Sequence, residues 1–134
     1  MNNNLARHRV LVVDDNVDAA QSLGLLLKLS GQDVSIAHDG LDGIEKAIEF
    51  RPELVLLDIG MPGMDGYEVC RRLRQHSATE KAILIALTGW GLEDDRQRSF
   101  QEGFDHHLIK PVEFDTLVKL LAKLEQGTEP KGHA

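Results

Sequence analysis

Four stretches of the sequence place a polar side chain directly after an apolar run. Asp14 and Asp15 follow VLVV, Asp58 follows LVLL, Thr88 follows LIAL, and Lys110 follows HLI. Taken alone, each of these residues has an ordinary role available, such as capping a helix, closing a turn or facing solvent. Three carboxylates at one place would repel one another and raise one another's pKa unless a cation joined them. If the fold brings these side chains together, the sequence predicts a metal site.

The donor atoms of this predicted site indicate which metal it would hold. They are oxygen atoms only, with neither His nor Cys among the ligands, which favours a hard cation. Mg²⁺ typically binds one or two carboxylates, keeps several waters and leaves room for a phosphate group. The three carboxylates and Lys110 together carry a charge of minus two, which one Mg²⁺ neutralises. Such a site is then ready to receive an anion.

The elements that must position these side chains can be read from the apolar pattern. Apolar segments at residues 9–14, 33–38, 53–58, 82–88 and 105–110 are expected to be strands. Helical patterns follow them, which predicts an α/β fold with one parallel sheet and helices on both faces. Ligands bind at the carboxyl edge of such sheets, where all five polar side chains would lie. Asp65 is expected to cap the third helix, and Asn16 or Asp15 the first.

The composition bounds the size and the partners of the protein. Its 134 residues, 42% of them hydrophobic, suit one domain, which we expect at residues 8–126 between loose ends at 1–7 and 127–134. A formal charge of minus seven argues against direct nucleic-acid binding, which depends on cationic contacts to phosphates. No apolar run approaches the roughly 20 residues that cross a membrane, and no signal-peptide pattern is present. We therefore expect a cytoplasmic protein that makes no membrane contact.

The motifs VVDDN, LLDIGMPGMDGYE, ALTG and LIKP, in this order and at these intervals, resemble the receiver domains of two-component response regulators. The resemblance covers about residues 8 to 125. It implies a three-layer, doubly wound (βα)5 flavodoxin-like fold with strand order 2-1-3-4-5. It also implies that Asp58 is a phosphoacceptor that receives a phosphoryl group from a histidine kinase or a histidine phosphotransfer protein. A protein of this family is a signalling phosphoacceptor with self-catalysed phosphorylation and dephosphorylation, and not an enzyme in the ordinary sense.

The resemblance assigns roles to the residues at the strand ends. Asp15, Asp58 and the backbone carbonyl of Gly60 would bind Mg²⁺, or alternatively Mn²⁺, while Asp14 holds a metal-bound water. Lys110 would pair with one phosphoryl oxygen, and the Thr88 hydroxyl would move to bond another.

Neighbouring positions complete the family's site. Gly89 would let the chain approach the phosphate closely, because glycine has no side chain. Pro111 would form a cis peptide bond with Lys110, as it does in the family.

Three positions leave the behaviour of the phosphate and the switch open. Gly60 stands where the family usually has a side chain that influences phosphate hydrolysis, so water should reach the site more easily. Trp90, two residues after Thr88, is large enough to cover the phosphate from the other side. His107 stands where the family usually has Tyr or Phe, and a switching role competes with that of a half-buried ring bonded to the backbone.

Two functions of other classes are the alternatives. A haloacid-dehalogenase-like phosphatase also uses an Asp nucleophile with Mg²⁺, but it needs a second Asp two residues later, where this sequence has Gly60. A flavodoxin-like cofactor binder holds phosphate in the loop after the first strand. Here that loop reads DDNVD, whose carboxylates would repel a bare phosphate.

The output of the protein is the part that the sequence leaves open. No effector domain follows residue 127, and GFDHHLIKPV resembles receivers fused to hybrid histidine kinases, so a stand-alone protein and an excised receiver are both open. The resemblance implies that a partner, or a second copy in a phosphorylation-dependent homodimer, binds through the fourth helix, fifth strand and fifth helix. The fourth helical segment has only Leu92 and Phe100 as large apolar residues, so we expect it to be weakly held. We also hypothesise that the active arrangement favours a neutral His107.

Overall fold

The computed structural model describes residues 6–89 and 93–127, and in this part of the chain five parallel strands form one sheet. The strands are β1 (Arg9–Val13), β2 (Asp33–Ala37), β3 (Leu54–Asp58), β4 (Ile83–Thr88) and β5 (His106–Ile109). Their order is β2-β1-β3-β4-β5, which is the order implied by the sequence resemblance. The helices that alternate with them are α1 (Val17–Leu29), α2 (Gly40–Phe50), α3 (Gly66–Gln75), α4 (Glu93–Glu102) and α5 (Phe114–Gly127).

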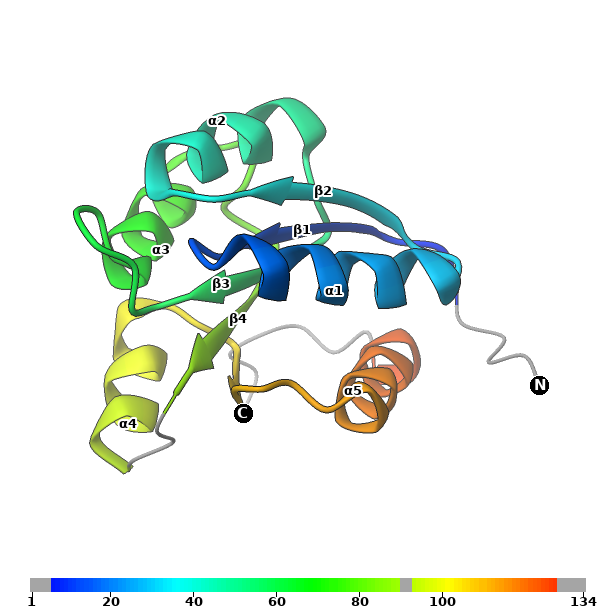
Figure 1. The fold of residues 1–134 in the computed structure, drawn as a ribbon. Coiled ribbons are helices and arrows are strands. Elements are labelled where there is room, and N and C mark those ends of the chain that lie inside the picture. Colours follow the sequence, from blue (N-terminus) through cyan, green and yellow to red (C-terminus); the bar gives the residue numbers. More distant parts are fainter. Residues whose placement is uncertain (1–5, 90–92, 128–134) are drawn as a thin grey trace.

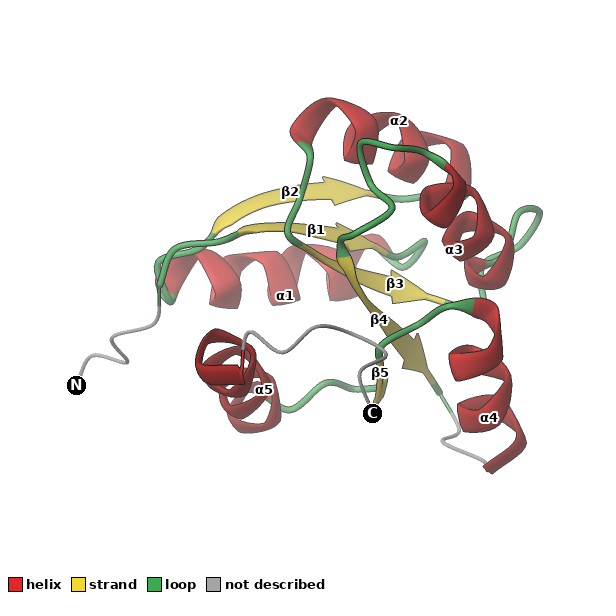
Figure 2. Ribbon diagram, turned by 180° about the vertical axis from the view of Figure 1, so that it is seen from behind, coloured by secondary structure: helices red, strands yellow, loops and turns green. Residues whose placement is uncertain are grey.

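The sheet is the middle of three layers, with α1 and α5 on one side and α2 and α3 on the other (Figures 1 and 2). Side chains alternate between the two faces, as the strand period of two requires. Val10 and Val12 of β1 pack with the α1 and α5 residues, whereas Leu11 and Val13 pack with the α2 and α3 residues. Both faces of the sheet are therefore buried, which explains why β3 reads as an uninterrupted apolar run.

Short polar side chains set where the first three helices begin. Asn16 caps α1 by accepting a hydrogen bond from the Ala19 amide at 3.0 Å, which decides between Asn16 and Asp15 for this role. Asp65 caps α3 as predicted, with its carboxylate 3.0 Å from the Glu68 amide. Asp39 caps α2 in the same way, a role that the sequence analysis did not assign. Each cap satisfies an amide that has no partner within its helix.

Gly66, the first residue of α3, allows this helix to begin directly against the end of β3. A Cβ atom at this position would lie 2.5 Å from Ile59 Cα and 2.6 Å from the Asp58 carbonyl oxygen. Both are main-chain atoms, which cannot move aside as the end of a flexible side chain can. The start of α3 is therefore packed tightly against the main chain of Asp58 and Ile59.

Polar and aromatic contacts join the described part of α4 to α3. Phe100 is 53% exposed, as expected for a helix that buries little, and Leu92 lies outside the described residues. Arg71 of α3 donates a 2.6 Å hydrogen bond to Glu102, and the guanidinium of Arg98 stacks 4.0 Å from the centre of the Tyr67 ring. These contacts between α3 and α4 were not apparent from the sequence.

Arg74 of α3 joins the starts of β4 and β5. Its guanidinium donates hydrogen bonds of 2.7 to 3.0 Å to the main-chain carbonyls of Glu80, Ala82 and Gly103. It also pairs at 2.8 Å with Asp105, whose same oxygen accepts from the Leu84 amide at 2.9 Å. A planar group with five N–H donors suits this cluster of acceptors, which a lysine could not satisfy as completely.

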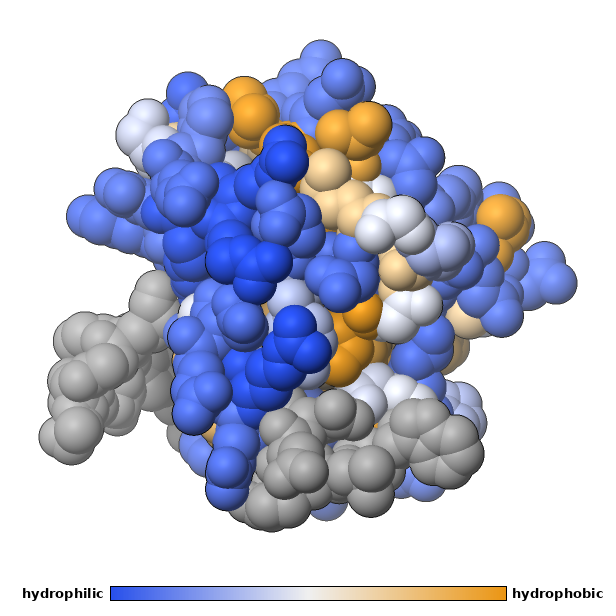
Figure 3. All heavy atoms as spheres, turned by 90° about the vertical axis from the view of Figure 1, so that its left-hand side faces the viewer, coloured by the Kyte–Doolittle hydropathy of each residue, from blue (hydrophilic) through white to orange (hydrophobic). Residues whose placement is uncertain are grey.

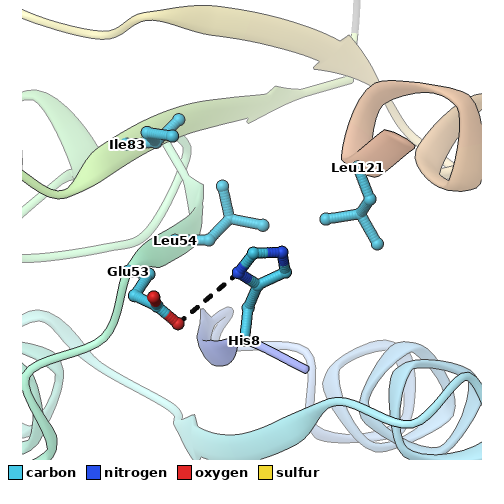
Figure 4. A pocket seen from close by; sticks show the side chains of 5 residues that line it. All are labelled: His8, Glu53, Leu54, Ile83 and Leu121. Atoms are coloured by element: carbon cyan, nitrogen blue, oxygen red, sulfur yellow. Dashed lines mark ion pairs between the residues drawn. The ribbon is translucent and has the colours of Figure 1, made fainter. Parts of the chain in front are cut away.

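The amino edge of the sheet contains a cavity of about 140 Å³, lined by His8, Glu53, Leu54, Ile83 and Leu121 (Figure 4). His8 Nδ1 lies 3.5 Å from Glu53 Oε1 at its polar side. Leu54 and Ile83 are the first residues of β3 and β4, so the cavity lies at the edge opposite Asp58.

The N-terminal end of the described chain makes contacts of its own. The carbonyl of Ala6 accepts from Gln32 Nε2 at 3.0 Å, and Arg7 Nε pairs with Asp33 at 3.0 Å. These residues belong to the segment 1–7 that was expected to be loose.

Among the helices of the described residues, none combines the length and the apolar character that a membrane span requires.

Candidate functional site

The three acidic residues singled out in the sequence meet at the carboxyl edge of the sheet. Carboxylate oxygens of Asp14, Asp15 and Asp58 all lie within 4.8 Å of one another. Asp14 and Asp58 are only 2% and 6% exposed, whereas Asp15 is exposed to solvent. The strand arrows in Figure 1 point to this edge, and Figure 3 shows that the face in question is mainly hydrophilic.

Asp14 is held by main-chain groups on both sides of it. Its amide donates to the Ala37 carbonyl at 3.0 Å, which continues the pairing of β1 with β2 by one residue. Its Oδ1 accepts from the Asn16 amide at 2.9 Å, and its own carbonyl oxygen lies 3.1 Å from Nδ1 of His38. The side chain is therefore fixed at the point where the chain turns from β1 into α1.

Asp58 is oriented by the loop that follows it. Its Oδ1 accepts a hydrogen bond from the Gly60 amide at 2.9 Å, which leaves Oδ2 directed at the other polar groups of the site. Leu87 of β4 stands opposite Asp58 in the sheet, so Thr88 lies one residue beyond it at the same edge. Thr88 is also buried, with 2% of its surface exposed.

Lys110 enters the site from the end of β5. Its Nζ lies 3.1 Å from Asp14 Oδ2 and 3.4 Å from Asp58 Oδ2, so one ammonium group bridges both buried carboxylates. The Lys110 amide donates to the Thr88 carbonyl at 2.7 Å, and the Lys110–Pro111 peptide bond is cis. The five strand-end side chains that the sequence singled out thus gather at one edge of the sheet.

Burial and the neighbouring charges change the pKa values of Asp58 and Lys110. Burial raises the pKa of Asp58 to about 6, and the neighbouring Asp14 carboxylate adds to the increase. The Gly60 amide and Lys110 act in the opposite direction without offsetting it. Burial lowers the pKa of Lys110, but Asp14 and Asp58 outweigh this effect and leave that pKa raised.

A divalent cation fits this set of donors. The ligand atoms are oxygens and converge within a few ångströms, and the three carboxylates outnumber the single ammonium group of Lys110 beside them. A hard cation would supply the missing positive charge.

Glycine is not required by packing at the two positions that would face a bound anion. A Cβ atom at Gly60 would meet Asp58 Oδ1 at 3.6 Å, which is ordinary contact, and one at Gly89 would meet nothing within 4 Å. Both positions can therefore accept a side chain in the absence of a ligand. Trp90, the residue expected to cover the site, lies outside the described residues.

His107 lies away from the carboxylates, on β5 opposite Ala86 of β4. Leu108 packs into the core cluster beneath α1 and α5, so the alternation of the strand turns His107 to the other face, where α4 contacts β5. The ring is half-buried.

Two residues that sequence reasoning missed support the site from outside the cluster. Gly66 had a local signal, since a glycine at the start of a helix beside a functional loop often marks a close approach of two backbones. His38 had none, because its contact with Asp14 joins residues 24 positions apart in the chain.

Comparison with known proteins reveals similarity over most of the chain. Residues 10–122 match the family model described as response regulator receiver domain. The response regulator MprA of Mycobacterium avium is 34% identical over 126 residues, which are 94% of this chain and 54% of that protein. The chain spans about half the length of the curated relatives that it matches.

Two solved structures illustrate the structural similarity. The chemotaxis protein CheY4 of Vibrio cholerae superposes with a TM-score of 0.83 at 30% identity, covering 88% of this chain and 98% of that one. The receiver domain of the sensor histidine kinase PA1611 from Pseudomonas aeruginosa gives a TM-score of 0.79 at 29% identity, covering 88% and 97%. That structure has a magnesium ion coordinated in its active site cleft.

Proposed function

The chain belongs to the response regulator receiver domain family, and on this premise we propose that Asp58 accepts a phosphoryl group from a phosphohistidine donor. The observation that carries the proposal is the gathering of three carboxylates and Lys110 at the carboxyl edge of the sheet. A purely structural role for Asp58 would not call for a second buried carboxylate and a shared ammonium group beside it. The donor would be a histidine kinase or a histidine phosphotransfer protein.

In the proposed reaction, an oxygen of the Asp58 carboxylate forms a bond to phosphorus. The bond from phosphorus to the donor imidazole nitrogen breaks, and its electron pair leaves with the imidazole. Asp58 must be ionised to attack, so the pKa of about 6 leaves most of this group reactive at neutral pH. Later attack of water on phosphorus would release phosphate and restore the carboxylate.

The other residues of the site would stabilise charge. Lys110 already spans Asp14 and Asp58, and we assign it to pair with a phosphoryl oxygen once the phosphoryl group is attached. Asp15, Asp58 and the Gly60 carbonyl would hold Mg²⁺ or Mn²⁺ directly, and Asp14 would hold it through water. When bound, the cation supplies positive charge that offsets the carboxylates and the phosphoryl oxygens.

We propose that the signal is read through Thr88, His107 and the surface of α4, β5 and α5. Thr88 would turn its hydroxyl toward the phosphoryl group, and His107 would follow on the face of β5 that α4 contacts. Phe100 of α4 and Ile109 of β5 support this surface, because they are 53% and 54% exposed and offer apolar side chains to a partner. The partner would be a downstream protein or a second copy of the chain, in the cytoplasm.

The alternative functions lack the groups that they require. A haloacid-dehalogenase-like phosphatase needs a carboxylic acid two residues after its nucleophile, and Gly60 offers none. A flavodoxin-like phosphate site after β1 would face Asp14 and Asp15. We therefore propose that residues 8–126 function as a receiver domain that accepts a phosphoryl group.

Phosphorylation of the purified protein tests the proposal. Incubation with acetyl phosphate or a phosphohistidine donor and Mg²⁺ should add one acid-labile phosphoryl group, detectable as an increase in mass. Asp58→Asn should abolish the increase, and EDTA should prevent it in the wild type. Undiminished labelling of Asp58→Asn at another residue would refute the assignment.

A further inference from the structure

His38 contacts the acidic cluster from outside, through the main chain. It directly follows Ala37, the last residue of β2, and its Nδ1 lies 3.1 Å from the Asp14 carbonyl oxygen. The Ala37 carbonyl accepts from the Asp14 amide at 3.0 Å. Both polar groups of the Asp14 main chain are therefore bound by consecutive residues at the end of β2, and the imidazole provides the donor that a further strand residue would have supplied.

The direction of this hydrogen bond follows from its acceptor. A carbonyl oxygen has no hydrogen to give, so Nδ1 of His38 must carry the proton and donate. The same residue does not start α2, since Asp39 performs that role through the Asp42 amide at 2.8 Å. The ring of His38 thus binds the Asp14 main chain and does not cap α2.

The carbonyl that His38 binds belongs to the peptide unit between Asp14 and Asp15. This unit is planar, so fixing its oxygen also fixes the direction in which the chain continues to the Asp15 Cα atom. The Asp14 carboxylate is held separately, by the Asn16 amide at 2.9 Å and by Lys110 at 3.1 Å. Asp15 is exposed, and its carboxylate depends on the main chain for its place in the cluster.

We propose that His38 is a positioning residue for the cation site. Its hydrogen bond to the Asp14 carbonyl sets the peptide that precedes Asp15 and so holds the Asp15 carboxylate at binding distance from Asp14 and Asp58. The inference rests on the proposed function, because it requires that the cluster binds Mg²⁺. It adds a residue that directly follows β2, the one edge strand that contributes no side chain to the cluster itself.

A pair of variants separates the hydrogen bond from the bulk of the ring. Asn places Nδ2, a donor, at the position of His Nδ1, whereas Leu fills similar space without a donor. Titration of the ¹⁵N-labelled full chain with MgCl₂, followed by amide chemical shifts, gives the Kd for Mg²⁺. His38→Leu should raise this Kd about fivefold, the factor that corresponds to one typical net hydrogen bond, and His38→Asn should restore it.

Thermal unfolding in EDTA distinguishes this role from a general loss of stability. If His38→Leu does not fold, His38→Ala with the same titration takes its place. His76→Leu is the matched control, because its ring accepts a hydrogen bond from the local Ala78 amide at 3.0 Å, and it should leave the Kd unchanged.

The outcomes separate the two proposals. If the wild type binds no Mg²⁺, the proposed function fails. If the wild type binds Mg²⁺ and His38→Leu binds it equally well, or His38→Asn binds it as weakly as His38→Leu, the role of His38 is refuted.

Discussion

Replacing Asp58 by Asn should stabilise the metal-free protein at neutral pH. The wild-type carboxylate is ionised there in a buried position beside Asp14, and the structure opposes that ionisation. Asn has nearly the same shape and keeps an acceptor for the Gly60 amide, so the substitution mainly removes the charge. Asp58, which is proposed to be essential for signalling, should therefore destabilise the folded protein when the metal is absent.

The magnitude follows from the acidity of Asp58. Its pKa rises from an ordinary 3.8 to about 6 in the folded protein. At about 1.4 kcal/mol for each pKa unit, ionisation costs the folded state about 3 kcal/mol. The pKa of Asp58 is higher in the folded state than in the unfolded state. The protonated Asp58 carboxyl therefore contributes its full stability below pH 3.8, and this contribution is lost as the pH rises through about 6.

Urea denaturation in EDTA, at several pH values between about 4 and 7.5, measures the effect as the difference between the variant and the wild type. The difference should be close to zero at the acidic end and approach about 3 kcal/mol at the neutral end. Adding Mg²⁺ should narrow it, because the cation binds and stabilises the folded wild type.

Asp33→Asn is the matched control, since it also removes one negative charge. The hydrogen bond from Arg7 lowers the pKa of Asp33, so this substitution should act with the opposite sign and reduce stability at neutral pH. If Asp58→Asn shows no gain in stability at pH 7.5, or a gain that does not vary with pH, the electrostatic account of the site is wrong.

Three further predictions concern packing and the switch. Gly66→Ala should lower the free energy of unfolding by about 2 kcal/mol or more, because its Cβ meets main-chain atoms, whereas Gly89→Ala should be nearly neutral in the same denaturation assay. Arg74→Ala should cost about 2 to 4 kcal/mol by leaving partly buried carbonyls and the Asp105 carboxylate without their donor, against less than about 1 kcal/mol for the exposed ion pair lost in Arg72→Ala. Binding of a downstream partner to the protein carrying a stable phosphate mimic should weaken between pH 7.5 and 5.5 in the wild type but not in His107→Phe, and an equal response in both would show that His107 is not the titrating group.

Much of the candidate site could be predicted because its residues are tied to local patterns. Asp14, Asp58, Thr88 and Lys110 each end or directly follow an apolar run, and a buried parallel strand needs just such a run. Parallel strands end at the same edge of a sheet, so their terminal side chains meet whatever the details of packing. The meeting of the carboxylates and the fold class were therefore accessible before any coordinates, whereas the strand order was implied only by the resemblance to receiver domains.

Other features depend on distances that no local pattern contains. The choice of Asn16 over Asp15 as a cap rests on backbone geometry at one turn, and the contacts of Arg74 with Gly103 and Asp105 cross 29 and 31 positions of the chain. The polarity of the segment 92–103 predicted a weakly held helix. It could not reveal that Arg71 and Tyr67 on α3 supply polar and aromatic contacts to that helix.

The sequence by itself determined which chemistry is available: carboxylates, an ammonium group and a hydroxyl at one edge of a parallel sheet. Only the tertiary structure decided how that chemistry is tuned, because burial, hydrogen bonding and charge separation depend on all the neighbours at once. The raised pKa of Asp58, the bridging place of Lys110 and the hold of His38 on the Asp14 carbonyl are properties of packed groups from different strands. A strand pattern predicts that such groups meet, and their final separations follow from the packing of the whole domain.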